Sequence, residues 1–307
     1  MQQTHIDLKQ RRDLGSIISV YFDFFKMNLK PFLNTFIQYN GFFVLGFLGI
    51  SYMMVTGFVG LFRSRYPYNE TYSSGNESLL WLGFLGFILL LIVTGILNYS
   101  LAASYTIRYE EHPEELPSKK SVWALVSKNL GGIFLFVVLM ILLYIPVIIV
   151  SVIVSIIPVV GMLGQYIISL GFTAWMGISF AAMLHQGKSV TDALGEGWRL
   201  IGKGFWKSIL ANLVISFLLF LLLMVVLMVP GIIIGIYAYF SLESGVDLSE
   251  SPFATVVWTL ALSILLLLFA FNQSLSQFIN SILYYNLYEE MYNEAARKRI
   301  EQIGVSE

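Results

Sequence analysis

The chain has 307 residues, of which 57% are hydrophobic and only 12% are charged, and its mean hydropathy is +0.76. Soluble domains carry about 25% charged residues, so this composition excludes an ordinary soluble protein and indicates an integral membrane protein. The net charge of −1 gives no sign of a nucleic-acid partner, and none is expected. Because the chain has no cysteine, disulfides, thiolate metal sites and cysteine nucleophiles are excluded.

Six uncharged runs are long enough to cross a hydrocarbon core of about 30 Å, which takes about 20 apolar residues. The runs cover residues 32–62, 79–107, 133–157, 159–184, 209–240 and 253–287. The third and fourth runs meet at Pro158, where IIPVVGMLGQ supplies proline and glycine for a tight turn. The sequence therefore predicts an all-α polytopic protein with six transmembrane helices in one membrane domain, residues 1–307. The charged first thirty or so residues do not fit a cleavable signal peptide.

The distribution of lysine and arginine predicts the orientation. Sixteen of these residues lie before the first run, after each even-numbered run or in the tail, whereas Arg63 and Arg65 lie on the opposite side. By the positive-inside rule, both termini are expected in the cytoplasm.

A short pattern occurs twice. KMNLKPFLNTF at 26–36 and KGFWKSILANL at 203–213 are 177 residues apart, and each precedes an odd-numbered run. The pattern contains four basic residues: Lys26, Lys30, Lys203 and Lys207. We interpret them as interfacial anchors for lipid headgroups, and a specific site for an anionic lipid or a partner is the alternative.

Amphipathic segments surround these lysines. Apolar residues recur at i, i+3 and i+4 in both, and they are Leu14, Ile17, Ile18, Tyr21, Phe22, Phe25 and Leu29 in the first and Val190, Leu194, Trp198, Ile201 and Phe205 in the second. On other faces of the second segment lie Asp192, Glu196, Arg199 and Lys203. Each segment is expected to form an interfacial helix that leads into a membrane helix. A weaker third copy covers residues 122–134.

The returning spans also repeat. Span two ends in NYSLAASYTIRYEE and span six in QFINSILYYNLYEE, with the two YEE motifs 179 residues apart. The pattern predicts three modules, each an interfacial helix plus a transmembrane hairpin, at 10–112, 117–186 and 188–292, followed by a charged cytoplasmic tail at 293–307. Since all three begin on one side, the repeat is parallel and not inverted. Chance similarity among apolar segments is the alternative.

Several motifs carry a family resemblance. LLYIPVII and LMVPGIII, each with a proline that is expected to break spans three and five, and LYYNL near the end of span six lie within residues 14–292. This region resembles the membrane domain fused to some bacterial glycerophosphodiester phosphodiesterases, and its stand-alone relatives, the YciC-like inner-membrane proteins. The resemblance implies a multi-pass protein of the bacterial inner membrane. It does not imply phosphodiesterase activity, which belongs to a soluble domain of the fused members.

Residues for chemistry inside the membrane are scarce. No Asp, Glu, Lys, Arg or His lies in the central part of any apolar run, although proton relays, ion paths and catalytic acids use these residue types. The three histidines, His5, His112 and His185, are far apart, so no metal and no cofactor are expected. Serines are plentiful, but none lies in a GxSxG motif. We do not expect an enzyme.

The remaining polarity is clustered in span six. Four polar residues follow i, i+4, i+7 and i+11, and two more take corresponding places in span two: Gln273, Gln277, Asn280 and Tyr284, with Asn98 and Tyr105. This stripe predicts either hydrogen bonds that join helices or a cytoplasm-facing pocket for a lipid headgroup. In span five, Gly231 and Gly235 form a small-xxx-small spacing, for which we favour helix packing within the chain over dimerisation.

Two functions remain open. The first is a non-enzymatic scaffold or accessory subunit of a larger inner-membrane complex, with membrane lipids and other membrane proteins as partners. The alternative is binding or transport of a lipid or small amphiphile through a groove between helical hairpins. Replacing Gln273, Gln277 and Asn280 with leucine is expected to abolish lipid handling but to leave a scaffold folded.

Overall fold

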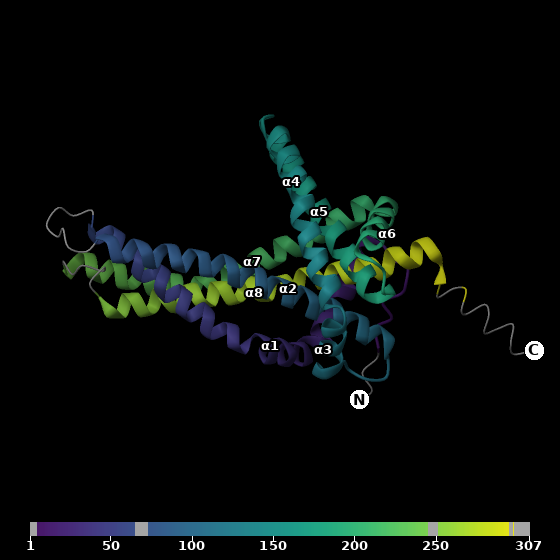
Figure 1. Cartoon of the computed structure of the whole chain (residues 1–307), viewed down its shortest axis with the longest axis horizontal. Helices are drawn as coiled ribbons and strands as arrows, with labels where there is room; N and C mark the ends of the chain where they lie inside the picture. The colour runs from purple at the N-terminus through teal and green to yellow at the C-terminus, as the bar shows by residue number, and fades with distance from the viewer. Residues whose placement is uncertain (1–4, 65–72, 245–250, 295–296, 298–307) are drawn as a thin grey trace, which may run out of the picture. The chain divides into compact units, whose positions relative to one another are not determined.

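The structure is a computed structural model that describes residues 5–64, 73–244, 251–294 and 297 (Figure 1). Within these residues the chain forms eight α-helices and no strand. The helices are α1 (Leu14–Ser64), α2 (Ser73–Glu111), α3 (Lys119–Lys128), α4 (Leu130–Ser155), α5 (Val160–Gln186), α6 (Val190–Lys203), α7 (Phe205–Ser244) and α8 (Pro252–Tyr292). Arg65 of the predicted outer loop and most of the predicted tail lie outside the described residues.

Six of these helices, α1, α2, α4, α5, α7 and α8, are long and apolar enough to cross a membrane. This confirms that the six predicted runs form long apolar helices, as in a multi-pass membrane protein. The predicted turn between spans three and four is also confirmed, because α4 ends at Ser155 and α5 begins at Val160. At this turn a Cβ on Gly161 would clash with the carbonyl oxygen of Val154, so the close approach requires glycine.

Two expected helix boundaries are wrong. The first amphipathic segment is not a separate helix, because α1 continues from Leu14 to Ser64 through Pro31. Spans three and five are not broken at their prolines, since α4 continues through Pro146 and α7 through Pro230. A proline removes only one backbone donor from a helix, and in lipid the remaining backbone groups have no other partners, which favours a continuous helix.

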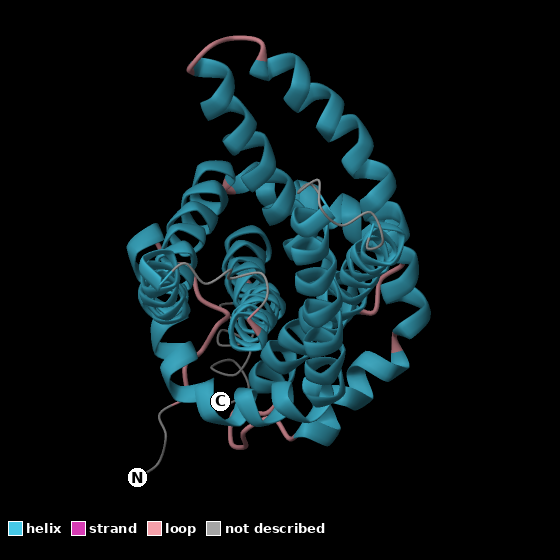
Figure 2. Cartoon of the chain, turned by 90° about the vertical axis from the view of Figure 1, so that its left-hand side faces the viewer, coloured by secondary structure: helices cyan, strands magenta, loops and turns pink. Residues whose placement is uncertain are grey.

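The other two amphipathic segments form separate helices. Helix α3 is capped by Asn129, whose backbone N–H donates to the carbonyl of Val126, and α6 is capped by Gly204, whose backbone N–H donates to the carbonyl of Ile201. Both helices begin at a serine cap, in which the side chain of Ser118 or Ser189 accepts a hydrogen bond from the backbone of the first turn. Figure 2 shows that helices dominate the described chain and that short loops join them.

The chain divides into two compact units. Unit 1 contains Met1–Thr35, Tyr99–Phe217 and Ser274–Glu307, and unit 2 contains Phe36–Asn98 and Leu218–Gln273. Helices α1, α2, α7 and α8 each contribute one part to each unit, whereas α3 to α6 belong wholly to unit 1. Both units therefore combine segments of the first and third predicted modules.

Glycines bring α1 and α2 together in unit 2. A Cβ on Gly57 would lie 2.6 Å from the backbone nitrogen of Leu80, and one on Gly83 would lie 2.8 Å from the side chain of Met54. Small residues permit this backbone approach, which is a common way for helices to associate in lipid. The glycines therefore fix how closely the first hairpin packs in this unit.

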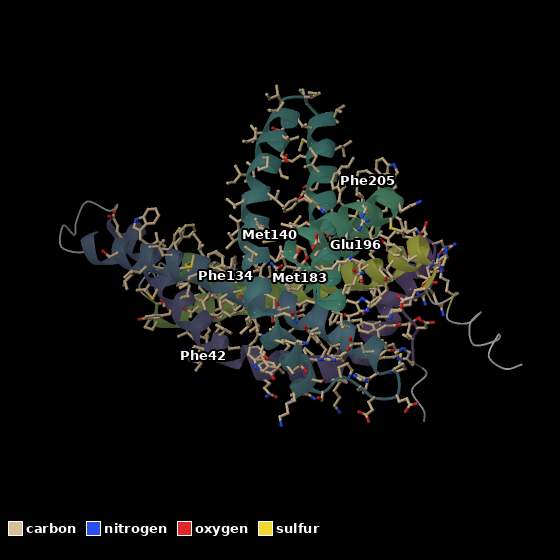
Figure 3. The ribbon with its side chains drawn as sticks, turned by 45° about the vertical axis from the view of Figure 1, so that its right-hand side comes forward. Phe42, Phe134, Met140, Met183, Glu196 and Phe205 are labelled. Atoms are coloured by element: carbon tan, nitrogen blue, oxygen red, sulfur yellow. The ribbon has the colours of Figure 1, made fainter. Side chains whose placement is uncertain are left out.

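Within unit 1, the α4–α5 hairpin stands away from the other helices over most of its length (Figures 1 and 3). On α4 only Ile133 and Phe136 are buried, and on α5 burial is continuous only from Met176 to Leu184. The outer part of the hairpin exposes large apolar side chains, among them Ile145, Ile149, Ile153, Met162 and Tyr166. Because such a surface is unfavourable in water, it is suited to lipid or to an apolar partner.

Candidate functional site

The predicted stripe on α8 divides at its first member. Gln277, Asn280 and Tyr284 are fully buried in unit 1, whereas Gln273 is exposed and belongs to unit 2. Helical spacing places all four on one side of α8, but it does not determine how far along the helix its neighbours cover that side. Gln273 therefore does not share the environment of the other three.

The buried amides of α8 bind two other helices. The side chain of Asn212 on α7 donates from Nδ2 to Oδ1 of Asn280 at 3.0 Å. Gln277 donates from Nε2 to the carbonyl oxygen of Gly177 on α5 at 3.2 Å. A Cβ on Gly177 would clash with the side chain of Asn280, so α5 and α8 are in close contact there. These groups thus join α5, α7 and α8 at one level of unit 1.

Tyr284 binds the end of α5. Gln186 donates from Nε2 to the Tyr284 hydroxyl at 2.8 Å, and Nδ1 of His185 lies 2.8 Å from the same hydroxyl. Because the hydroxyl already accepts from Gln186, its proton is available to His185, which favours the tautomer with the proton on Nε2. The rings of Tyr285 and Tyr288 lie 5.2 and 6.3 Å from the His185 ring.

The two residues from span two also bind α1, but in different units. In unit 1 the Tyr105 hydroxyl donates to Oδ1 of Asn28 at 2.9 Å. In unit 2 Asn40 donates from Nδ2 to Oδ1 of Asn98 at 2.7 Å. Each contact is a buried hydrogen bond between the first two spans, so these side chains contribute to packing within each unit.

The four predicted basic anchors are not equivalent. Lys26, Lys30 and Lys203 are exposed, as expected for groups that meet headgroups or water. Lys207 is half-buried, and its ammonium lies 2.6 Å from the carboxylate of Glu290 on α8. Lys207 therefore joins α7 to α8 within unit 1, in addition to any role at the membrane surface.

The expected packing of α7 at its glycine pair is wrong. Gly231 and Gly235 are both exposed, and a Cβ at either position would meet open space among the described residues. Among the residues that the structure describes, the small-xxx-small spacing therefore mediates no packing within the chain.

Glu196 is a buried acid that the sequence pattern placed on an outer face of its helix. Its carboxylate accepts from Lys188 at 3.0 Å and from the Tyr292 hydroxyl at 2.8 Å, and it also pairs with Arg199. Burial by itself raises the pKa of Glu196, but these hydrogen bonds and the two cations outweigh it, so the pKa lies below its ordinary value. Figure 3 labels Glu196 on α6 within unit 1.

On α6 the predicted apolar stripe does not coincide with the face that packs on the rest of unit 1. Trp198, a member of that stripe, is 64% exposed, whereas Ala193 and Gly197 are buried. A Cβ on Gly197 would clash with the hydroxyl of Ser179 on α5, so a glycine is required where these helices meet. The small residues at 193 and 197 were the available signal for the buried face.

The start of α1 shows a similar difference. Ile17 and Tyr21 of the predicted stripe are buried, but so are Phe24 and Asn28 outside it, whereas Phe22 of the stripe is 44% exposed. The amphipathic segments thus pack one face on unit 1 and retain exposed aromatic residues on another. Exposed tryptophans such as Trp123, Trp198 and Trp206 are suited to the membrane interface.

The segment before α1, residues 5–13, is a further feature that periodicity could not reveal. The backbone nitrogen of Ile6 donates to the Tyr109 hydroxyl at 2.9 Å, and that of Leu8 donates to the Glu110 carboxylate at 3.0 Å. The Leu8 side chain is fully buried. These contacts bind one end of the segment to the last turn of α2.

The same segment reaches the end of α8. Asn286 donates from Nδ2 to the carbonyl oxygen of Gln10 at 2.8 Å, and Arg11 donates to the carbonyl oxygens of Glu289 and Glu290 at 3.4 and 3.2 Å. The segment therefore bridges the two YEE motifs, 109–111 and 288–290, within unit 1.

Most of these polar groups bind a partner within unit 1, although Oε1 of Gln277 is buried without a hydrogen-bond partner among the described residues. Among the described residues no group of three or more His, Cys, Asp and Glu could hold a metal ion. Glu196 is surrounded by three donors, and the buried amides of α7 and α8 bind each other or backbone carbonyls. The arrangement therefore holds helices in place.

Comparisons of the chain with protein-family models, curated proteins and solved structures found no match. The resemblance drawn from the motifs stays a prediction.

Proposed function

We propose that this protein is a non-enzymatic scaffold or accessory subunit of a larger complex in the bacterial inner membrane, with both termini in the cytoplasm. The observation that carries the proposal is the burial of Gln277, Asn280 and Tyr284 in hydrogen bonds between helices of unit 1. A site that binds a headgroup needs polar atoms directed toward the ligand, whereas these side chains bind α5 and α7.

The proposed three-module repeat has support from equivalent contacts. Tyr105 and Tyr284, which are 179 residues apart, are both fully buried and both bind a side chain of another helix. Asn28 and Asn129, matched in the repeat, each donate from Nδ2 to the carbonyl oxygen four residues earlier at 2.9 Å. The burial of the two tyrosines is the stronger support, because Asn40, Asn212 and Asn280 also donate to the carbonyl four residues earlier.

Membrane lipids and other membrane proteins are the proposed partners. The outer α4–α5 hairpin supports this, since its exposed apolar side chains need a cover that water cannot provide. The exposed Lys26, Lys30 and Lys203 suit anionic headgroups at the cytoplasmic surface, where each such charge is worth about 1 kcal/mol.

The test is mass spectrometry of the protein extracted from its native membrane in a polymer that retains lipid. We expect a protein partner in fixed stoichiometry, absent from an unrelated tagged membrane protein extracted in parallel. A lone protein that carries one enriched lipid class would contradict the proposal and favour the binding or transport of a lipid or small amphiphile.

A further inference from the structure

The ends of α2 and α8 contact both the main chain and the side chains of residues 5–12. Ile6 and Leu8 donate backbone N–H groups to Tyr109 and Glu110, and Gln10 offers its backbone carbonyl to Asn286. Residues 6 and 8 lie before a bend at Lys9 and Gln10, and their N–H groups reach neighbouring acceptors on one helix end. Backbone hydrogen bonds of this kind are one way in which proteins bind a peptide segment.

One side chain adds an apolar anchor to these backbone contacts. Leu8 is fully buried, although its neighbours Asp7 and Lys9 are only half-buried. A buried leucine between polar neighbours is the pattern of a peptide that inserts one residue into its receptor. Two aromatic rings of the helix ends also contact the segment. His5 stacks on Tyr109 of α2 with ring centroids 4.4 Å apart, and the Lys9 ammonium lies 5.7 Å from the centre of the Tyr285 ring on α8.

The charges of the two partners are complementary. The segment is basic after Leu8, at Lys9, Arg11 and Arg12, and the helix ends are acidic. Glu110 accepts from the segment directly, and Arg11 caps the last carbonyls of α8, where the helix dipole favours a cation. The segment thus has hydrogen bonds, an apolar anchor and matching charge at one place.

We propose that the ends of α2 and α8 form a peptide-binding site, and that residues 5–12, HIDLKQRR, occupy it as a latch supplied by the same chain. The ligand class is a short peptide that carries one apolar side chain, bends directly after it and continues with basic residues. The latch joins the two YEE motifs on the side of unit 1 where the chain begins. This inference is independent of the proposed scaffold function, because it concerns only contacts within unit 1.

The test is hydrogen exchange of the full-length protein and of Leu8→Asp, read by mass spectrometry. A buried carboxylate is strongly unfavourable, so Leu8→Asp is expected to release the latch and to raise exchange in residues 5–12 by about tenfold or more. Exchange at the ends of α2 and α8 should rise with it, while α5 stays protected. Ser19→Ala is the control, because that side chain is exposed on α1 and lies outside residues 5–12, and it should exchange as the wild type does.

A synthetic peptide of residues 5–12 completes the test. Added to Leu8→Asp, it is expected to restore protection at both helix ends, whereas the same peptide with aspartate in place of Leu8 is not. If Leu8→Asp also exposes α5, Glu110→Gln serves as the second variant and should weaken the latch alone. Unchanged exchange in residues 5–12 of both variants would overturn the proposal, and protection that falls on dilution would overturn the assignment to the same chain.

Discussion

Amide side chains in the core of unit 1 bind one another because lipid around a helix offers them no partner. Asn212 and Asn280 form such a pair, and Gln277 uses a backbone carbonyl instead. Replacing Gln277 and Asn280 is therefore not a neutral probe of lipid handling, since it also removes contacts that join helices. The exposed Gln273 is the appropriate comparison for them.

Asn280→Leu is expected to lower stability by about 0.6 to 2 kcal/mol, the range for hydrogen bonds between membrane helices. It removes the acceptor of Asn212 and forces a branched side chain toward Gly177. Thermal unfolding in detergent, followed by tryptophan fluorescence, measures the change. Gln273→Leu should leave the midpoint unchanged, and an equal loss in both variants would argue against the role of the Asn212 contact.

The lowered pKa of Glu196 predicts that the stability of the folded protein depends on pH. Its pKa in the folded protein lies below the ordinary value of 4.5, so its contribution to stability is complete above that value and is lost as the pH falls through the folded pKa. The wild type should exceed Glu196→Gln in unfolding temperature at about pH 7, and the gap should shrink as the pH falls below 4.5. The exposed Glu115→Gln is the control. A gap that stays constant with pH would mean that the carboxylate charge is not responsible.

At the scale of the elements, glycines decide which helices approach closely. Gly177 faces α8, Gly197 faces α5 and Gly57 faces α2, and a Cβ at each would overlap a neighbour. Other glycines, such as Gly171 on α5, face open space. The same residue type therefore has a packing role at one position of α5 and none at another.

Gly177→Ala is expected to destabilise the protein by about 1 to 3 kcal/mol, because added volume in a close contact forces the helices apart. Gly171→Ala on the same helix should be neutral or stabilising by up to about 1 kcal/mol, since alanine favours a helix. Both midpoints are measured in one detergent. A larger loss for Gly171→Ala than for Gly177→Ala would contradict the packing of α5 on α8.

At the scale of the whole molecule, the absence of cysteine makes the proposed orientation directly testable. Single cysteines at Lys120 and Glu77, both exposed, lie on opposite sides of the membrane in the proposed topology. In spheroplasts, an impermeant maleimide is expected to label Glu77→Cys at once and Lys120→Cys only after permeabilisation. The wild type is the unlabelled control. The reverse pattern would invert the orientation and place both termini outside.

The sequence was enough to predict the membrane-spanning segments but not the side of each helix that is buried. The six spans and the turn at Pro158 were predictable, because a long uncharged run in lipid must form a helix that satisfies its own backbone. The face that each helix buries was not, as Glu196 and Trp198 show. Apolar periodicity identifies a hydrophobic side, but in a membrane protein that side can meet lipid as well as protein.

By itself, then, the sequence determined the number, length and helical nature of the spans, since these depend on local composition and backbone hydrogen bonding. Only the tertiary structure decided that Gln277 is buried while Gln273 is exposed, that Glu196 meets Tyr292, and that residues 5–12 bind the ends of two distant helices. Such contacts depend on the rotation and spacing of helices far apart in the chain, which glycines and buried polar pairs set jointly and no local pattern records.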